Sequence, residues 1–232
     1  MTMPFYVSPE QVMADKAEFA RKGIARGKSI VALEYDNGVL LIAENSTSLS
    51  KVGEIYDRIA FAGVGKFSEF DMLRKIGVRF ADSRGYQYSR DDVRGKALAN
   101  AYSQAVGEAF TNQMKPLEVE MIVAEVGDDS LVGHEHNSLY RVKFDGFISD
   151  HKGFCVIGGN VEDVQSVLDD DYEEGMTQGD AVQLGLKALT RGASDNSTLD
   201  ATTLEVCILD RSRSRRKFTR LSADIVQDML NA

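Results

Sequence analysis

Apolar and polar residues follow one another in blocks along this chain, and the first block indicates a helix. Ser8 can cap a helix, Pro9 suits its first position, and Gln11 can complete a capping box. Apolar residues then recur at helical spacing, at Met13, Ala17, Ala20 and Ile24. The pattern predicts a helix over residues 9–26.

A strand-rich block comes next, followed by two helical stretches. Two apolar runs flank Asp36-Asn37-Gly38, which is typical of a β-hairpin turn. Residues 55–65 are expected to form a further strand that ends in glycines. Helical spacing returns over residues 66–81 and 91–114. Asp91 and Asp92 should complement the dipole at the start of the second of these helices.

The second half repeats this order of strands and then helices. Strands are predicted over residues 117–126, 138–144 and 147–159, with a hairpin turn at Asp145-Gly146. Helices are predicted over 160–175 and 179–192, then strands over 202–210 and 216–221, and a short helix from Ser222. Grouping of this kind favours antiparallel sheets with helices on their outer faces. Without a linker-like segment, residues 1–232 are interpreted as one domain.

Composition and charge narrow the classes of function. The chain has 232 residues and a formal net charge of −9, which argues against binding to nucleic acid or to an anionic membrane surface, because both repel an acidic protein. Cys155 and Cys207 lie in apolar runs and are expected to be small buried hydrophobic residues in a reducing compartment. The N-terminal residues lack the pattern of a secretory signal, so a cytoplasmic protein is expected.

Three local motifs have an unremarkable interpretation. His134 and His136 form an H-x-H pair in a predicted loop, but a metal site needs further ligands, so neither a metal nor a cofactor is expected. Gly158-Gly159-Asn160 is interpreted as a strand-to-helix turn. The arginine-rich stretch 210–218 is interpreted as a solvated hairpin, or alternatively as a subunit contact.

Five strings, in this order, carry a resemblance that covers nearly the whole chain. They are "EFARKGIARGKS" leading into "NGVLLIAE", "SKVGEIYDRIAFAGVGK", "GDAVQLGLKAL" and "TLEVCILD". Together they resemble the proteasome core-particle family, which includes N-terminal-nucleophile hydrolases. The helix predicted before the first hairpin is similar to α-type subunits, above all those of actinobacteria. The resemblance implies an α+β fold, a four-layer αββα sandwich of the N-terminal-nucleophile-hydrolase type.

The resemblance also raises the question of whether the chain is an enzyme. A β-type subunit begins its first strand with a threonine whose free amine acts as the base. Lys28 and Ser29 occupy that place here, whereas Glu44 and Lys51 stand where the catalytic acid and lysine would lie. The expectation is a non-catalytic α subunit. Two alternatives stay open, namely an active hydrolase that uses Ser29 after cleavage before it, and a soluble binding module without ring partners.

For an α subunit, the resemblance implies heptameric outer rings that gate substrate entry, template assembly with β subunits and dock a ring-shaped regulatory ATPase. ATP-dependent degradation of unfolded, tagged proteins would follow. Lys51 is either a solvated loop lysine or, as the resemblance implies, the receptor for the C-terminal carboxylate of the ATPase. Gly65, Lys66 and Arg21 would complete that pocket. The gate is expected in residues 1–8, and its candidates are Pro4, Phe5, Tyr6 and Pro9.

Overall fold

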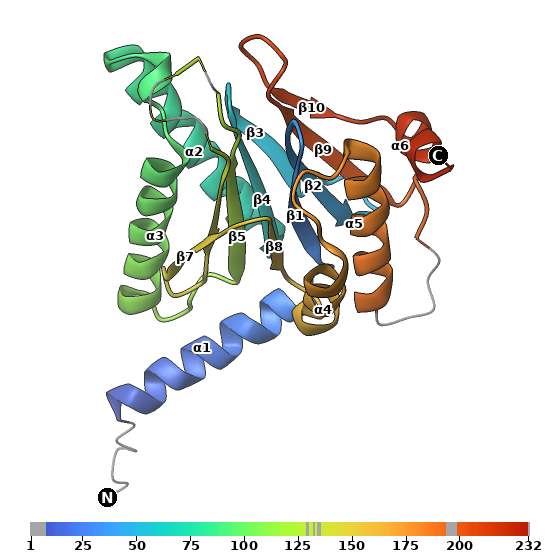
Figure 1. Ribbon diagram of the computed structural model, residues 1–232. Helices are drawn as coiled ribbons and strands as arrows, with labels where there is room; N and C mark the ends of the chain where they lie inside the picture. The colour runs from blue at the N-terminus through green and yellow to red at the C-terminus, as the bar shows by residue number, and fades with distance from the viewer. Residues whose placement is uncertain (1–7, 129, 132, 134–135, 194–198, 232) are drawn as a thin grey trace, which may run out of the picture.

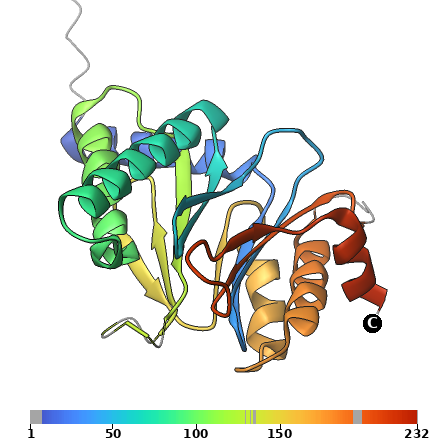
Figure 2. The same cartoon turned by 90° about the horizontal axis from the view of Figure 1, so that it is seen from above.

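Two antiparallel sheets stacked face to face form the centre of the protein. The computed structural model describes residues 8–128, 130–131, 133, 136–193 and 199–231. The first sheet has the strand order β10-β9-β2-β1-β8, and the second has the order β3-β4-β5-β6-β7. Helices cover the two outer faces, as Figure 2 shows from above. The expected αββα sandwich is confirmed.

The first sheet is covered by α4 (Val161–Asp171), α5 (Gln178–Gly192) and α6 (Ala223–Asn231). Its strands are β1 (Ile30–Tyr35), β2 (Gly38–Glu44), β8 (Phe154–Ile157), β9 (Leu204–Asp210) and β10 (Phe218–Arg220). The second sheet is covered by α2 (Phe67–Gln87) and α3 (Gly95–Asn112). Its strands are β3 (Val52–Tyr56), β4 (Ile59–Gly65), β5 (Val119–Glu125), β6 (Ser138–Val142) and β7 (Ile148–His151).

The central strands are buried on both faces, which explains why they are apolar almost throughout. In β1, Ile30 and Ala32 face the second sheet, whereas Val31 and Leu33 pack beneath α4, α5 and α6. This alternation is the two-residue period of a strand applied to two separate cores. Small residues such as Ala60 fill much of the space between the sheets.

The two cysteines lie in the core between the sheets. Both are free and buried, and burial raises the pKa of the Cys155 thiol to about 12 and that of Cys207 to about 12. A thiol with a raised pKa is a weak nucleophile at neutral pH, because the reactive species is the thiolate. The prediction that both are small buried hydrophobic residues is confirmed.

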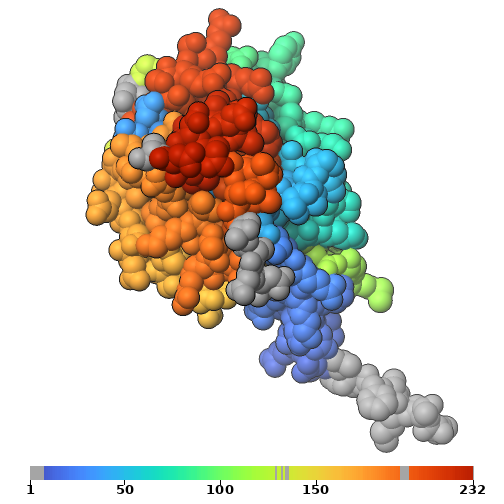
Figure 3. Space-filling model, turned by 90° about the vertical axis from the view of Figure 1, so that its right-hand side faces the viewer, coloured from blue at the N-terminus to red at the C-terminus, as the bar shows by residue number. Residues whose placement is uncertain are grey.

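The N-terminal helix α1 (Pro9–Ala25) stands out from the body of the protein (Figures 1 and 3). Ser8 caps it through a hydrogen bond from the Gln11 backbone N–H, as predicted. The Gln11 side chain instead donates to Asp15, so the reciprocal half of the expected capping box is wrong. The second half of α1 contacts the sandwich: Ala20 and Ile24 are buried, Ala17 packs against the core between the sheets, and the Lys16 ammonium donates to the Phe110 carbonyl oxygen at 3.0 Å.

Three other expectations about local structure are wrong. Residues 55–65 contain a turn at Asp57-Arg58 and belong to two strands, β3 and β4, rather than one. Residues 147–159 contain β7 and β8, which lie in different sheets. Asp91 and Asp92 form a short 3-10 helix before α3, and the Glu125 carboxylate accepts the first N–H of α3 from Gly95 at 2.8 Å instead.

Candidate functional site

The candidate residues gather at one end of the sandwich, which we call the α1 end. Here β1 and β3 begin and β2 and β4 finish, since Ile30 pairs with Ala43 and Val52 pairs with Ala62. The chain arrives from α1, whose C-cap is Arg26. The antiparallel pairing therefore places the start of β1 beside the end of β2 in front of the last turn of α1 (Figure 1).

Lys28 and Ser29 lie directly before β1, at the place that the sequence resemblance assigns to a catalytic N-terminal residue. The Ser29 hydroxyl is buried and donates to the Gly158 carbonyl oxygen at 3.1 Å. Its nitrogen is a peptide nitrogen, because the chain runs on through Gly27 into α1. The Lys28 ammonium lies 3.1 Å from a carboxylate oxygen of Glu44. The Ser29 hydroxyl is hydrogen-bonded to a carbonyl oxygen, and the Ser29 nitrogen is a peptide nitrogen that cannot act as a base. The two groups therefore do not form an activated nucleophile.

A hollow of about 490 Å³ opens onto these residues, lined among others by Lys28, Ser29, Glu44 and Gly159. Its charged lining consists of Arg26 and the Lys28–Glu44 pair, so the wall is polar with one excess positive charge. The hollow thus lies at the start of β1, and two of the side chains that line it, Lys28 and Glu44, pair with one another.

Lys51 is half-buried just before β3, and its side chain reaches back to β2. Its ammonium donates to the Glu44 carbonyl oxygen at 2.7 Å. Burial lowers the pKa of Lys51 below its usual value of 10.5, while Glu44 and Glu205 oppose that shift by favouring the charged form. Among the described residues the ammonium makes this one hydrogen bond, so it retains donors for an incoming acceptor.

Gly65 is the last residue of the neighbouring strand β4, and Lys66 follows it as the N-cap residue of α2. Lys51 accepts a hydrogen bond from Gly63 at 3.0 Å, which places it beside the end of β4. Gly65 has a φ of +109°, and a β-carbon there would lie 1.9 Å from the Glu118 carbonyl oxygen, so the close approach requires glycine. The Lys66 ammonium is 3.3 Å from Glu69 in the first turn of α2. The pairing of β3 with β4 thus puts Lys51 and Gly65 at neighbouring strand ends. The ammonium groups of Lys51 and Lys66 have different partners.

Arg21 lies apart from Lys51 within the single chain. Its guanidinium is 5.6 Å from the centre of the Phe144 ring, a cation–π contact. It lines a different hollow of about 260 Å³, together with Glu120, Arg141 and Phe144. Lys51 is not among the residues that line this hollow.

Several candidates are not placed by the structure. The gate residues Pro4, Phe5 and Tyr6 lie outside the described residues, and so does His134. Pro9 is described and is the first residue of α1. Among the described residues, no group of three or more His, Cys, Asp or Glu side chains is arranged to hold a metal ion.

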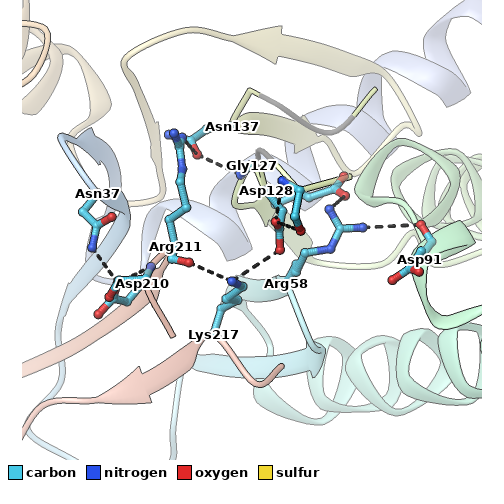
Figure 4. A network of polar contacts seen from close by, with 12 residues as sticks. Asn37, Arg58, Asp91, Gly127, Asp128, Asn137, Asp210, Arg211 and Lys217 are labelled. Atoms are coloured by element: carbon cyan, nitrogen blue, oxygen red, sulfur yellow. Dashed lines mark hydrogen bonds and ion pairs between the residues drawn. The ribbon is translucent and has the colours of Figure 1, made fainter. Parts of the chain in front are cut away.

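The opposite end of the sandwich, which we call the turn end, holds a polar network that the pattern of polar and apolar residues does not predict (Figure 4). Lys217 is buried; its ammonium donates to the Arg211 carbonyl oxygen at 2.7 Å and lies 3.3 Å from Asp128. Arg58, also buried, is 3.3 Å from Glu125. The expectation of a solvated hairpin over 210–218 is therefore wrong at Lys217, although residues 212–216 are exposed. Nothing in a run of like-charged residues indicates which of them is buried in the folded protein.

The fold and site together define a class. A two-sheet sandwich between helical layers, with a nucleophile position at the start of β1, is the N-terminal-nucleophile-hydrolase type of fold. A family model described as "Proteasome subunit" matches residues 24–209. The chain therefore belongs to the proteasome subunit family, and within it to the actinobacterial α type, as its relatives indicate.

Three relatives illustrate this similarity, and each carries the name "Proteasome subunit alpha". The protein of Xylanimonas cellulosilytica is 52% identical over 230 residues, which covers 95% of this chain and 93% of the relative. The protein of Thermobifida fusca is 48% identical and that of Thermomonospora curvata 49%, each over 99% of this chain and over 91% and 98% of the relative. None of the helices in the described part of the chain is long and apolar enough to cross a bilayer.

Proposed function

We propose that this chain is a non-catalytic α subunit, seven copies of which form the outer ring of a proteasome core particle in the cytoplasm. The observation that carries the proposal is the continuous chain from α1 into β1. It leaves the Ser29 nitrogen in a peptide bond and the Ser29 hydroxyl on the Gly158 carbonyl. Peptide hydrolysis would then take place on β subunits, and residues 1–232 would form one α-type domain.

The surface of α1 supports assembly into a ring. Val12, Met13 and Phe19 are between 37% and 46% exposed in the single chain. A protruding helix with exposed apolar side chains is typical of a surface that oligomerisation covers. In the proposed ring, α1 packs against a neighbouring subunit, and residues 1–8 close the pore and open it for unfolded, tagged substrates.

Lys51 supports docking of a ring-shaped regulatory ATPase through the C-terminal carboxylate of its tail. A partly desolvated ammonium that retains donors is a strong receptor for a carboxylate, because charge-assisted hydrogen bonds gain strength where water is excluded. Gly65 and Lys66 form the neighbouring edge, and Arg21 of an adjacent copy would approach from its own α1.

Native mass spectrometry of the purified chain, alone and with its candidate β subunit, tests the proposal. We expect an uncleaved subunit mass and a heptamer or a four-ring particle. A monomer that never joins a β subunit would overturn the proposed function. A mass that lacks residues 1–28 would instead support an active hydrolase with Ser29 as nucleophile.

The docking role has a separate test. Lys51→Ala should weaken binding of the ATPase tail at least about tenfold, since a hydrogen bond to a charged group contributes about 1.5–3 kcal/mol. Lys75→Ala is the matched control, because Lys75 lies on the outer face of α2 and pairs with Asp71. Equal binding by the Lys51→Ala ring and the wild-type ring would contradict the role.

A further inference from the structure

A single buried carboxylate, that of Glu205, gathers the loop that carries Lys51. One of its oxygens accepts from the Asn45 side-chain amide at 2.6 Å and from the Lys51 backbone N–H at 2.9 Å. The other accepts from the Val52 N–H at 3.1 Å and from Arg220. Glu205 thus holds the first residue of the loop 45–51, its last residue and the start of β3.

The position of Glu205 in β9 explains how one side chain reaches so many partners. Glu205 is directly opposite Ala43 of β2. Alternation along β9 puts Glu205 on the same face as Cys207 and Leu209, which lie in the core between the sheets. Its carboxylate therefore crosses from the first sheet to the beginning of β3 in the second sheet.

The backbone of Lys51 depends on this contact. Its carbonyl oxygen accepts from Gly63 of β4, but its N–H lies one residue before β3 and is directed to Glu205. Two successive N–H groups, those of Lys51 and Val52, converge on one carboxylate. A carboxylate, with two acceptor oxygens, is suited to this arrangement.

Arg220 makes the burial of this charge tolerable. Its guanidinium pairs with Glu205 and also donates to the Val52 carbonyl oxygen at 2.8 Å. Asn45 adds order on the other side, because its amide also donates to the Leu49 carbonyl oxygen at 2.9 Å, and its backbone N–H donates to Thr203 at 2.8 Å. The loop is thus tied at both ends to β9 and its neighbours.

We propose that Glu205 is a positioning residue for carboxylate docking, which holds the Lys51 backbone so that its ammonium stays at the Glu44 carbonyl and faces an incoming tail. This inference rests on the proposed docking role of Lys51. It assigns Glu205, a residue on a different strand and 154 positions away, to the same site.

Glu205→Gln is the sharpest test. The oxygen that the variant keeps should face the cationic Arg220, so the new amide NH₂ would oppose the Lys51 N–H, donor against donor. Glu54→Gln is the matched control. It removes the same charge from β3, next to another arginine, Arg216 at 2.7 Å, and leaves the contacts of Lys51 intact.

The probe is an eight-residue peptide copied from the C-terminus of the regulatory ATPase of the same genome, prepared as a free acid and as an amide. Its affinity for assembled rings is measured by fluorescence polarisation. The ratio of the two affinities isolates recognition of the carboxylate from any general change in the ring. We expect Glu205→Gln to reduce this ratio about five- to tenfold, and Glu54→Gln to leave it unchanged. Lys51→Ala should bring the ratio to about one. Glu205→Gln combined with Lys51→Ala should leave the ratio at that value.

The outcomes separate the two proposals. If Lys51→Ala keeps the wild-type ratio, the docking role of Lys51 is overturned, and this inference with it. If Lys51→Ala abolishes the ratio but Glu205→Gln keeps it, or weakens both peptides equally, only the role of Glu205 is overturned. Should Glu205→Gln fail to assemble, Asn45→Ala removes one contact of the same carboxylate. It should lower the ratio about threefold, and an unchanged ratio there overturns the role.

Discussion

The two ends of the sandwich use charged residues in opposite ways. Each end ties one sheet to the other, through Glu205 at the α1 end and through Lys217 at the turn end. At the turn end, Arg58 and Lys217 are buried and turned toward partners inside the protein. At the α1 end, Lys51 is half-buried, and its ammonium has a single hydrogen-bond partner among the described residues. Buried ions that pair inside the protein must keep their partners for the fold to be stable, whereas a cation with donors to spare can bind a partner.

The largest expected effect breaks the closed end. Arg58→Ala should lower the free energy of unfolding by about 3–5 kcal/mol, because it leaves the buried Glu125 without its ion pair. Urea unfolding of the subunit measures the change. Arg216→Ala, which removes an exposed guanidinium from Glu54, is the control and should leave the midpoint nearly unchanged. Equal midpoints for the two variants would show that the turn end is not a closed network.

A second prediction sharpens the contrast through pH. Docking of the free-acid peptide requires the Lys51 ammonium, and burial lowers the pKa of that ammonium below 10.5, with Lys28 adding to the shift and Glu44 and Glu205 opposing it. Affinity should therefore fall as pH rises through a midpoint below 10.5, whereas the amide peptide should show no such transition. A titration of the two peptides against wild-type rings checks this. A midpoint at or above 10.5 would contradict a desolvated Lys51.

The smallest expected effect concerns Tyr35 at the turn end. Its buried hydroxyl has no hydrogen-bond partner among the described residues, and burial raises its pKa above the usual value, as do Asp210 and Asp36. Tyr35→Phe should change the free energy of unfolding by no more than about 1 kcal/mol, toward greater stability, because it removes an unsatisfied polar group. The exposed Tyr86→Phe is the control in the same urea series. A clear loss of stability would mean that the Tyr35 hydroxyl has a partner.

Local chemistry made much of the fold predictable. Ser8 and Pro9 mark the start of α1, and Asp36-Asn37-Gly38 marks the β1–β2 hairpin, because caps and tight turns depend on a few adjacent residues. The turn at Asp57-Arg58 was missed because it contains neither glycine nor proline, and Asp57 alone is a weak turn signal within a largely apolar run. The break between β7 and β8 was missed for a different reason, since strand pairing decides which sheet a strand joins.

Some residues of the candidate site could likewise be predicted from the sequence, and others could not. Lys51 was found because its string resembles a known family, and Ser29 because it begins a recognisable strand. Glu205 and Lys217 were missed because their surroundings in the sequence, "TLEVCILD" and an arginine-rich run, look ordinary for a strand and a solvated turn. Nothing in those strings shows that Glu205 receives the N–H groups of Lys51 and Val52.

The sequence by itself determined the blocks of helices and strands, the apolar strands of a doubly covered sandwich, and the presence of Lys28 and Ser29, with no threonine, directly before the first strand. These follow from side-chain chemistry and short-range spacing, which are present in the unfolded chain. Only the tertiary structure decided which charged side chains pair inside the protein and which keep hydrogen-bond donors for a binding partner. Burial and partners depend on residues far apart in sequence, such as Glu205 and Lys51, that meet only when the two sheets stack.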